Sequence, residues 1–115
     1  MRYMLLIYAN EEQLGNMTED DRVGAMKAHY AYSQALVDAG AHVDGAPLQM
    51  SQSATLVQVR DGETLTTDGP YAETKEQLAG YYLIEAPDLD AALSWAKRCP
   101  GAAHGSIEVR PVWSM

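Results

Sequence analysis

The sequence predicts an α+β domain in which two β-α-β halves share one sheet and a β-hairpin is inserted between them. Three observations lead to this class. Residues 2–9 and 80–86 form segments that are apolar on both faces, as strands covered on both sides are. Each segment is followed, after a capping residue, by a helical segment. An Asp-Gly pair between two β-rich segments indicates a tight hairpin.

The order of elements is therefore strand, helix, strand, hairpin, strand, helix, strand. This is the split β-α-β, or ferredoxin-like, plan with an extra hairpin, and its first and third main strands are central. The two segments that are apolar on both faces occupy these central positions. Two helices cover only one face of such a sheet, and a chain of 115 residues has no further layer. We therefore expect a homodimer in which a second copy covers the other face.

The first helix is expected from about Glu19 to Ala39. Thr18 and Asp21 form a capping-box pattern at its start, and Gly40 follows its end. At 100° per residue, one face is predicted to pack against the sheet and to contain Val23, Met26, Tyr30, Ser33 and Val37. His29 and Leu36 lie on the flank of this face. A short strand over residues 41–49 comes next.

The inserted hairpin is expected over residues 55–60 and 63–67, around Asp61-Gly62. A stiff connection at Asp68-Gly69-Pro70 follows, because Pro fixes its own φ and lacks a donor. Beyond it, Thr74 and Gln77 are predicted to cap a single helical turn.

The second helix begins after the N-cap Asp88 and ends near Cys99. Its apolar stripe is predicted to comprise Leu89, Ala92, Leu93 and Ala96. A strand over residues 106–112 completes the sheet.

Composition excludes several classes of partner. The formal net charge is −8, without a Lys/Arg cluster, which argues against nucleic acid or an anionic membrane as partner. No apolar run approaches the about 18 residues of a membrane span. The lone Cys99 cannot form an internal disulfide, which suits a reducing cytoplasm. The three His residues lack metal-ligand spacing and no Gly-rich nucleotide loop is present, so we expect neither a metal nor another cofactor.

The stretch from Asp68 to Glu85 begins Asp-Gly-Pro-Tyr and resembles the DGPF group of the YCII-related family. Tyr71 stands where that group has Phe. Residues 2–8, the Ala28-His29 pair, and residues 87–90 and 105–112 are also similar to that family, so the resemblance covers nearly the whole chain, taken as one domain over residues 1–115.

This resemblance implies a dimeric α+β barrel whose fold is similar to that of muconolactone isomerases. Most members are uncharacterised, a small aromatic dehydrochlorinase belongs to the YCII group, and a His–Asp pair has been proposed as the family's active site. Genes of the DGPF group often lie beside, or are fused to, extracytoplasmic-function sigma factors, which implies a regulatory role instead.

The candidate catalytic residues are His29 and Asp68. An imidazole titrates in the range used for acid–base chemistry. His29 either transfers a proton or is a packed histidine bonded to a hydroxyl such as that of Ser33. Asp68 would orient the His29 ring if its turn directs the carboxylate there. The alternative is an Asp that starts a turn by bonding its own backbone.

The candidate substrate-binding residues are Ser33, Tyr71, Lys75 and Tyr82. Tyr71 and Lys75 would donate to, or neutralise, an anionic substrate, and the alternative for Lys75 is a solvated charge. Tyr82 would line a pocket that is apolar in body and polar at points, or else fill the core or the dimer interface. His42 and Asp44, at i and i+2 of a strand, would face one site together, and the favoured alternative is a solvated edge strand.

Two functions remain open. One is a small cofactor-free enzyme of the isomerase or lyase type, in which His29 and Asp68 perform acid–base chemistry on a small anionic or aromatic molecule. The other is a non-catalytic ligand-binding or regulatory protein-interaction module, associated with a sigma factor.

Overall fold

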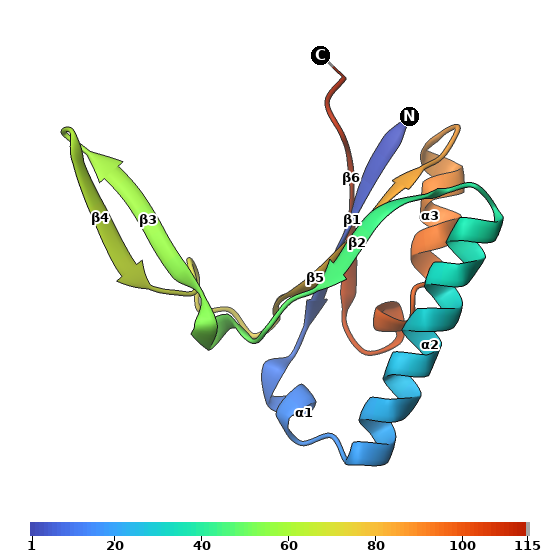
Figure 1. Ribbon diagram of the computed structural model, residues 1–115, viewed down its shortest axis with the longest axis horizontal. Coiled ribbons are helices and arrows are strands. Elements are labelled where there is room, and N and C mark those ends of the chain that lie inside the picture. The colour runs from blue at the N-terminus through green and yellow to red at the C-terminus, as the bar shows by residue number, and fades with distance from the viewer. Residues whose placement is uncertain (115) are drawn as a thin grey trace.

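The computed structural model describes residues 1–114, and its main sheet has four antiparallel strands with the two long helices on one face (Figure 1). The strands are β1 (Arg2–Ala9), β2 (His42–Pro47), β5 (Gln77–Glu85) and β6 (Ser106–Pro111). Their order is β2-β5-β1-β6, so the first and third main strands are central. This is the predicted ferredoxin-like α+β arrangement.

The two long helices begin at the positions that their capping residues predict. The hydroxyl of Thr18 accepts the Asp21 N–H at 3.1 Å, the Asp21 carboxylate accepts the Thr18 N–H at 3.3 Å, and α2 (Glu19–Asp38) follows. Asp88 caps α3 (Leu89–Arg98) by accepting the Ala91 N–H at 2.8 Å. Gly40 ends α2 with a φ of +71°, as predicted from its position. Three short helices complete the chain: α1 (Glu11–Gly15), η1 (Ser51–Ser53) and η2 (Pro100–Ala103).

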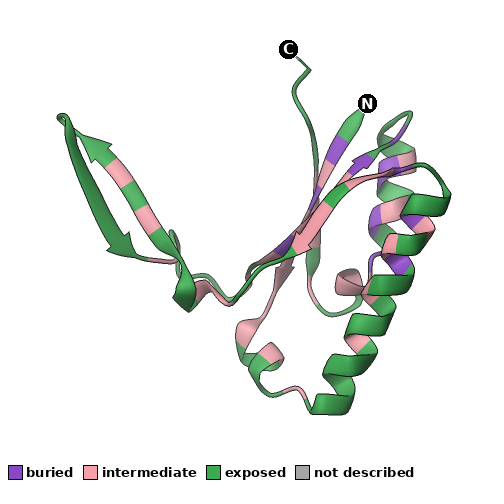
Figure 2. Ribbon diagram, viewed as in Figure 1, coloured by how far each residue is buried: buried purple, intermediate pink, exposed green. Residues whose placement is uncertain are grey.

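The core lies between the sheet and the two long helices (Figure 2). β1 and β5 contribute alternate side chains to it, as the pleat of a strand requires. Its main members are Tyr3, Leu5, Ile7, Tyr32, Leu36, Tyr82, Ile84, Ala92 and Ala96.

The predicted packing face of the first helix is wrong at four of its five positions, the exception being Ser33. Val23, Met26, Tyr30 and Val37 are 44%, 71%, 74% and 53% exposed, whereas Tyr32 and Leu36 are buried. Apolar residues lie all around this Ala-rich helix, so its periodicity does not single out one face. In α3, likewise, Ala92 and Ala96 are buried while Leu89 and Leu93 stay exposed, because small side chains allow the helix to approach the sheet closely.

The hairpin forms as predicted but stands away from the rest of the molecule (Figure 1). β3 (Thr55–Arg60) and β4 (Glu63–Asp68) pair only with each other, and Asp61 and Gly62 have positive φ values of 52° and 79°. We call residues 55–68 the arm. The predicted helical turn after Pro70 is wrong, because the Gln77 amide there donates to the Ala72 and Thr74 carbonyls and Gln77 itself starts β5.

The second face of the sheet carries no helix (Figure 1). Tyr3, Leu5 and Ile7 point toward the helices, so the intervening side chains of β1 point the other way. We call the partly exposed side chains on this side the open face: Met4, Leu6, Tyr81 and Leu83. Within residues 1–114, no helix is long and apolar enough to cross a membrane.

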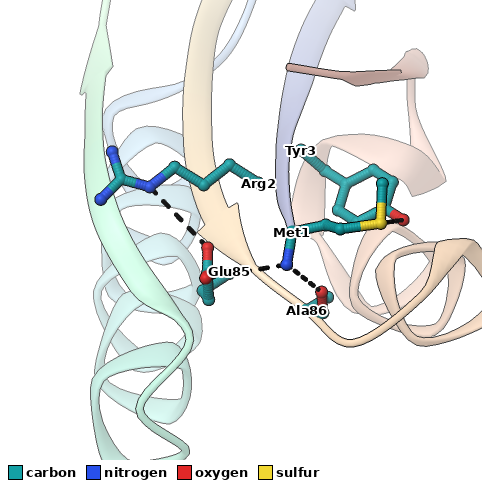
Figure 3. A network of polar contacts seen from close by, with 5 residues as sticks. All are labelled: Met1, Arg2, Tyr3, Glu85 and Ala86. Carbon is teal, nitrogen blue, oxygen red and sulfur yellow. Dashed lines mark hydrogen bonds and ion pairs between the residues drawn. The ribbon is translucent and has the colours of Figure 1, made fainter. Parts of the chain in front are cut away.

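The start of β1 is joined to the end of β5 (Figure 3). The Met1 nitrogen donates to the Ala86 carbonyl at 3.1 Å, and the Ala86 N–H donates to the Met1 carbonyl at 2.9 Å. The Glu85 carboxylate lies 3.7 Å from both the Met1 nitrogen and Arg2 Nε. These charged side chains are more than half exposed, so the ion pairs add little, and the backbone bonds set the register of the central strands.

Candidate functional site

A cavity of about 420 Å³ lies between the middle of α2 and the β2–β5 side of the sheet. Helix α2 contributes three residues with polar groups, His29, Tyr30 and Ser33, of which His29 and Ser33 lie one turn apart. The remaining lining comes mainly from β2 and β5 and includes His42, Gly45, Ala46, Ala79, Gly80, Tyr81 and Tyr82.

The hydroxyl of Tyr82 lies within hydrogen-bond distance of both His29 and Ser33. His29 Nδ1 lies 3.1 Å from Tyr82 Oη, and Ser33 Oγ donates to the same oxygen at 3.3 Å. The imidazole and phenol rings are nearly parallel, with an interplanar angle of 15°. One phenol oxygen thus holds an imidazole and a serine hydroxyl in a fixed arrangement.

The position of Tyr82 depends on a glycine in the neighbouring strand. Gly45 lies opposite Tyr82 in the β2–β5 register. A Cβ at Gly45 would lie 2.9 Å from Tyr82 Cδ1 and 3.0 Å from the Tyr81 carbonyl oxygen, so only glycine leaves room for the ring. On its other side the ring packs edge-on against Tyr32, with centroids 5.1 Å apart.

Burial sets the protonation of the two titratable partners. It lowers the pKa of His29, so the ring is neutral at pH 7. It raises the pKa of Tyr82, an effect that the hydrogen bond from Ser33 partly offsets, so the phenol keeps its proton. No residue that lines the cavity is Asp, Glu, Lys or Arg. The site therefore combines a neutral imidazole, a phenol and a serine hydroxyl in surroundings without fixed charge.

The structure unites only some of the predicted site residues within one copy. His29, Ser33 and Tyr82 lie together, whereas Asp68 ends β4 in the arm, on the other side of the sheet from α2 (Figure 1). Among the described residues, no hydrogen bond or ion pair joins Asp68 to His29. Within the arm, Asp68 pairs with Thr55 at the base of the ladder.

Tyr71 and Lys75 also lie away from His29, near the base of the arm. Tyr71 is 82% exposed and borders a separate cavity of about 670 Å³. Lys75 borders another cavity, of about 500 Å³, beside the acidic residues Glu11 and Glu12.

His42 lines the His29 cavity, although its sequence position indicates a solvated edge strand. A register shift between His42 and Asp44 changes the alternation of β2. This shift depends on pairing with β5, so no local sequence signal places His42 in the site. Across residues 1–114, His, Cys, Asp and Glu side chains do not gather in groups of three or more that would hold a metal ion.

Fold and site together define an α+β protein of the ferredoxin-like class with an uncharged imidazole–phenol pocket beside its first long helix. A family model, that of the YCII-related domain, matches residues 1–115. An uncharacterised protein of Rhizobium meliloti (strain 1021) is 37% identical over 114 residues, which cover 97% of this chain and 92% of that protein. The chain belongs to the YCII-related family.

Proposed function

We propose that the His29 pocket performs cofactor-free proton transfer on a small aromatic molecule that carries a carbonyl group, as in an isomerase or lyase. One observation carries this proposal: His29 Nδ1 and Ser33 Oγ both lie within hydrogen-bond distance of Tyr82 Oη in a largely apolar cavity. Tyr82 takes the orienting position beside His29 that the sequence suggested for Asp68. Of the anionic and aromatic ligands considered from the sequence, the uncharged lining favours an aromatic one.

The direction of the His29–Tyr82 hydrogen bond decides the chemistry. When the proton is on Nδ1, His29 and Ser33 both donate to the phenol oxygen, which accepts two hydrogen bonds. Nε2 is then an unprotonated base, and the Tyr82 O–H is available to a substrate oxygen. Removal of a proton next to a carbonyl needs these two groups, a base and a donor to the developing oxyanion.

The other tautomer supports binding alone. Tyr82 then donates to Nδ1, and Nε2 carries the proton and acts only as a donor. A pocket fixed in this state would bind a ligand oxygen without acting as a base. The tautomer of His29 with a ligand bound therefore distinguishes the enzyme from a ligand-binding module.

Hydrogen–deuterium exchange of an enolisable ketone tests the proposal. In D₂O, the wild-type chain is expected to accelerate loss of the benzylic ¹H signal of phenylacetone, and His29→Gln is expected to reduce the rate to that of buffer. His104→Gln is the matched control, because His104 borders a different cavity. Equal rates for His29→Gln and wild type would overturn the proposal. Ligand-induced amide shifts at Ala79 and Gly80 without exchange would establish the binding module instead.

We further propose that the chain belongs to the DGPF group, acts in the cytoplasm and forms a homodimer through the open face. The Asp68-Gly69-Pro70 turn supports the group, and the free, buried Cys99 suits a reducing compartment. The open face supports the dimer, because Leu6 and Leu83 lie there without a covering layer. Sheets that pack face to face bury such side chains between them.

A further inference from the structure

The chain exposes far more surface than a compact monomer of its size. Its accessible surface is 8176 Å², about 2,000 Å² more than expected for a mass of 12.6 kDa. Its radius of gyration is 15.9 Å, against about 13 Å for a compact domain of this length. A stable interface needs only about 800 Å² from each partner. The excess is thus more than twice what one dimer interface requires.

The arm accounts for much of this excess. None of its strand residues is buried, and a two-stranded hairpin alone is at best marginally stable in water. On one side of the arm, beyond Asp68 and its partner Thr55 at the base, the residues are β-branched: Val57 pairs with Thr66 and Val59 with Thr64. Val57 and Val59 are 59% and 60% exposed. We call these four residues the arm platform, and none of them is charged.

Hydrogen bonds at the base of the arm keep the arm away from the rest of the same chain. Glu11 of α1 accepts hydrogen bonds from the Ser51 N–H, at 2.7 Å, and from the Ser51 hydroxyl. The Gly69 N–H donates to the Ala54 carbonyl at 2.7 Å and closes the base of the ladder. A Cβ at Gly69 would lie 2.8 Å from Ala54 Cβ, so glycine is required there. Both connections at the base of the arm are therefore hydrogen-bonded within one copy.

We propose that the arm is an exchange arm, whose platform packs against a second copy of this chain. The proposal rests on the homodimer proposed above. The same chain carries two uncovered β surfaces, the open face and the arm platform, and the bonded base keeps them apart within one copy (Figure 1). A two-fold dimer covers both surfaces at once, because each copy offers an arm and accepts one. The excess surface is large enough for both contacts.

Sedimentation velocity of arm variants over a concentration series tests the exchange. Val57→Lys/Val59→Lys is expected to raise the dimer dissociation constant about ten-fold or more, since it places two charges in an apolar contact. Both side chains are exposed in one copy, so the fold of the monomer is retained. Gln58→Lys/Thr67→Lys introduces the same charge on the opposite side of the arm and is expected to change the constant less than about two-fold.

A substitution in the open face distinguishes a failure of the exchange-arm proposal from a failure of the dimer proposal. A dimer weakened by Leu6→Lys but not by Val57→Lys/Val59→Lys would overturn the exchange arm and leave the dimer intact. A wild-type chain that is monomeric at about 50 µM would overturn both. Amide exchange adds a second readout: the arm amides of the wild type are expected to be more protected at high than at low protein concentration. Proton transfer at His29 has its own assay and does not depend on these results.

Discussion

Replacing Tyr82 with phenylalanine separates the packing of this residue from its hydrogen bonding. The ring is 7% exposed and keeps its edge-on contact with Tyr32, so Tyr82→Phe creates no cavity. The change removes only Oη, and with it the contacts to His29 at 3.1 Å and Ser33 at 3.3 Å. Any effect of the variant therefore reports on the phenol hydroxyl.

The structure indicates a small loss of stability. The Ser33 contact at 3.3 Å is longer than the most frequent O–H···O distance of about 2.8 Å, and the His29 contact at 3.1 Å is slightly longer than the most frequent N–H···O distance of about 3.0 Å. Both contacts are only partly buried. About 0.5 kcal/mol for each bond gives a total near 1 kcal/mol. For a domain of this size that corresponds to a decrease in Tm of about 5 °C, measurable by circular dichroism.

The expected effect on proton transfer is much larger. Loss of a positioned donor to a developing oxyanion lowers rates about 100-fold, and Tyr82→Phe also leaves Nδ1 without its partner. The phenylacetone exchange rate and the ¹⁵N shifts of His29 measure both consequences. An unchanged exchange rate in a variant with the expected Tm would refute the assigned role of the hydroxyl, because its loss would then affect stability without affecting proton transfer.

Three further predictions follow from the same geometry. Burial lowers the pKa of His29, so the unfolded chain binds a proton more readily than the folded chain. The free energy of unfolding is therefore expected to decrease as pH falls below about 6.5. The difference in this free energy between wild type and His29→Gln across the pH range isolates the effect. Gly45→Ala is expected to cost about 1–3 kcal/mol by displacing the Tyr82 ring, whereas Gly24→Ala, where a Cβ meets open space on a helix, is expected to stabilise by about 0.5–1 kcal/mol in urea unfolding. Asp68→Asn is expected to leave the NMR titration of His29 unchanged in the monomer, and a shifted titration there would contradict the placement of Asp68 in the arm.

Local signals predicted most of the fold because the groups they involve are close in sequence. The caps at Thr18 and Asp88 and the turn at Asp61-Gly62 each depend on a few neighbouring residues. The central strands were identified because β1 and β5 are apolar on both sides, which is independent of their partners. The packing face of α2 was not predicted correctly, because its contacts join residues distant in sequence, such as the Tyr32 hydroxyl and the Trp95 carbonyl at 2.6 Å.

The candidate site was likewise predictable from local sequence only in part. Helical spacing sets His29 and Ser33 one turn apart, the family resemblance singled out His29, and Tyr82 was among the residues expected in a pocket. Their convergence on one oxygen depends on the register that sets Gly45 opposite Tyr82, which no local pattern encodes. The direction of the arm, and with it the position of Asp68, depends on hydrogen bonds between α1 and η1.

Ser33 links ligand binding to the basicity of His29. Its hydroxyl donates to one lone pair of the Tyr82 oxygen and leaves one further lone pair and the phenol proton to be satisfied. In an empty pocket, we expect Tyr82 to satisfy its proton by donating to Nδ1, so that Nε2 carries the ring proton. A ligand carbonyl that accepts the phenol proton leaves Nδ1 to donate to the second lone pair. The proton of the neutral ring then lies on Nδ1, and Nε2 becomes a base only when a substrate oxygen is in place.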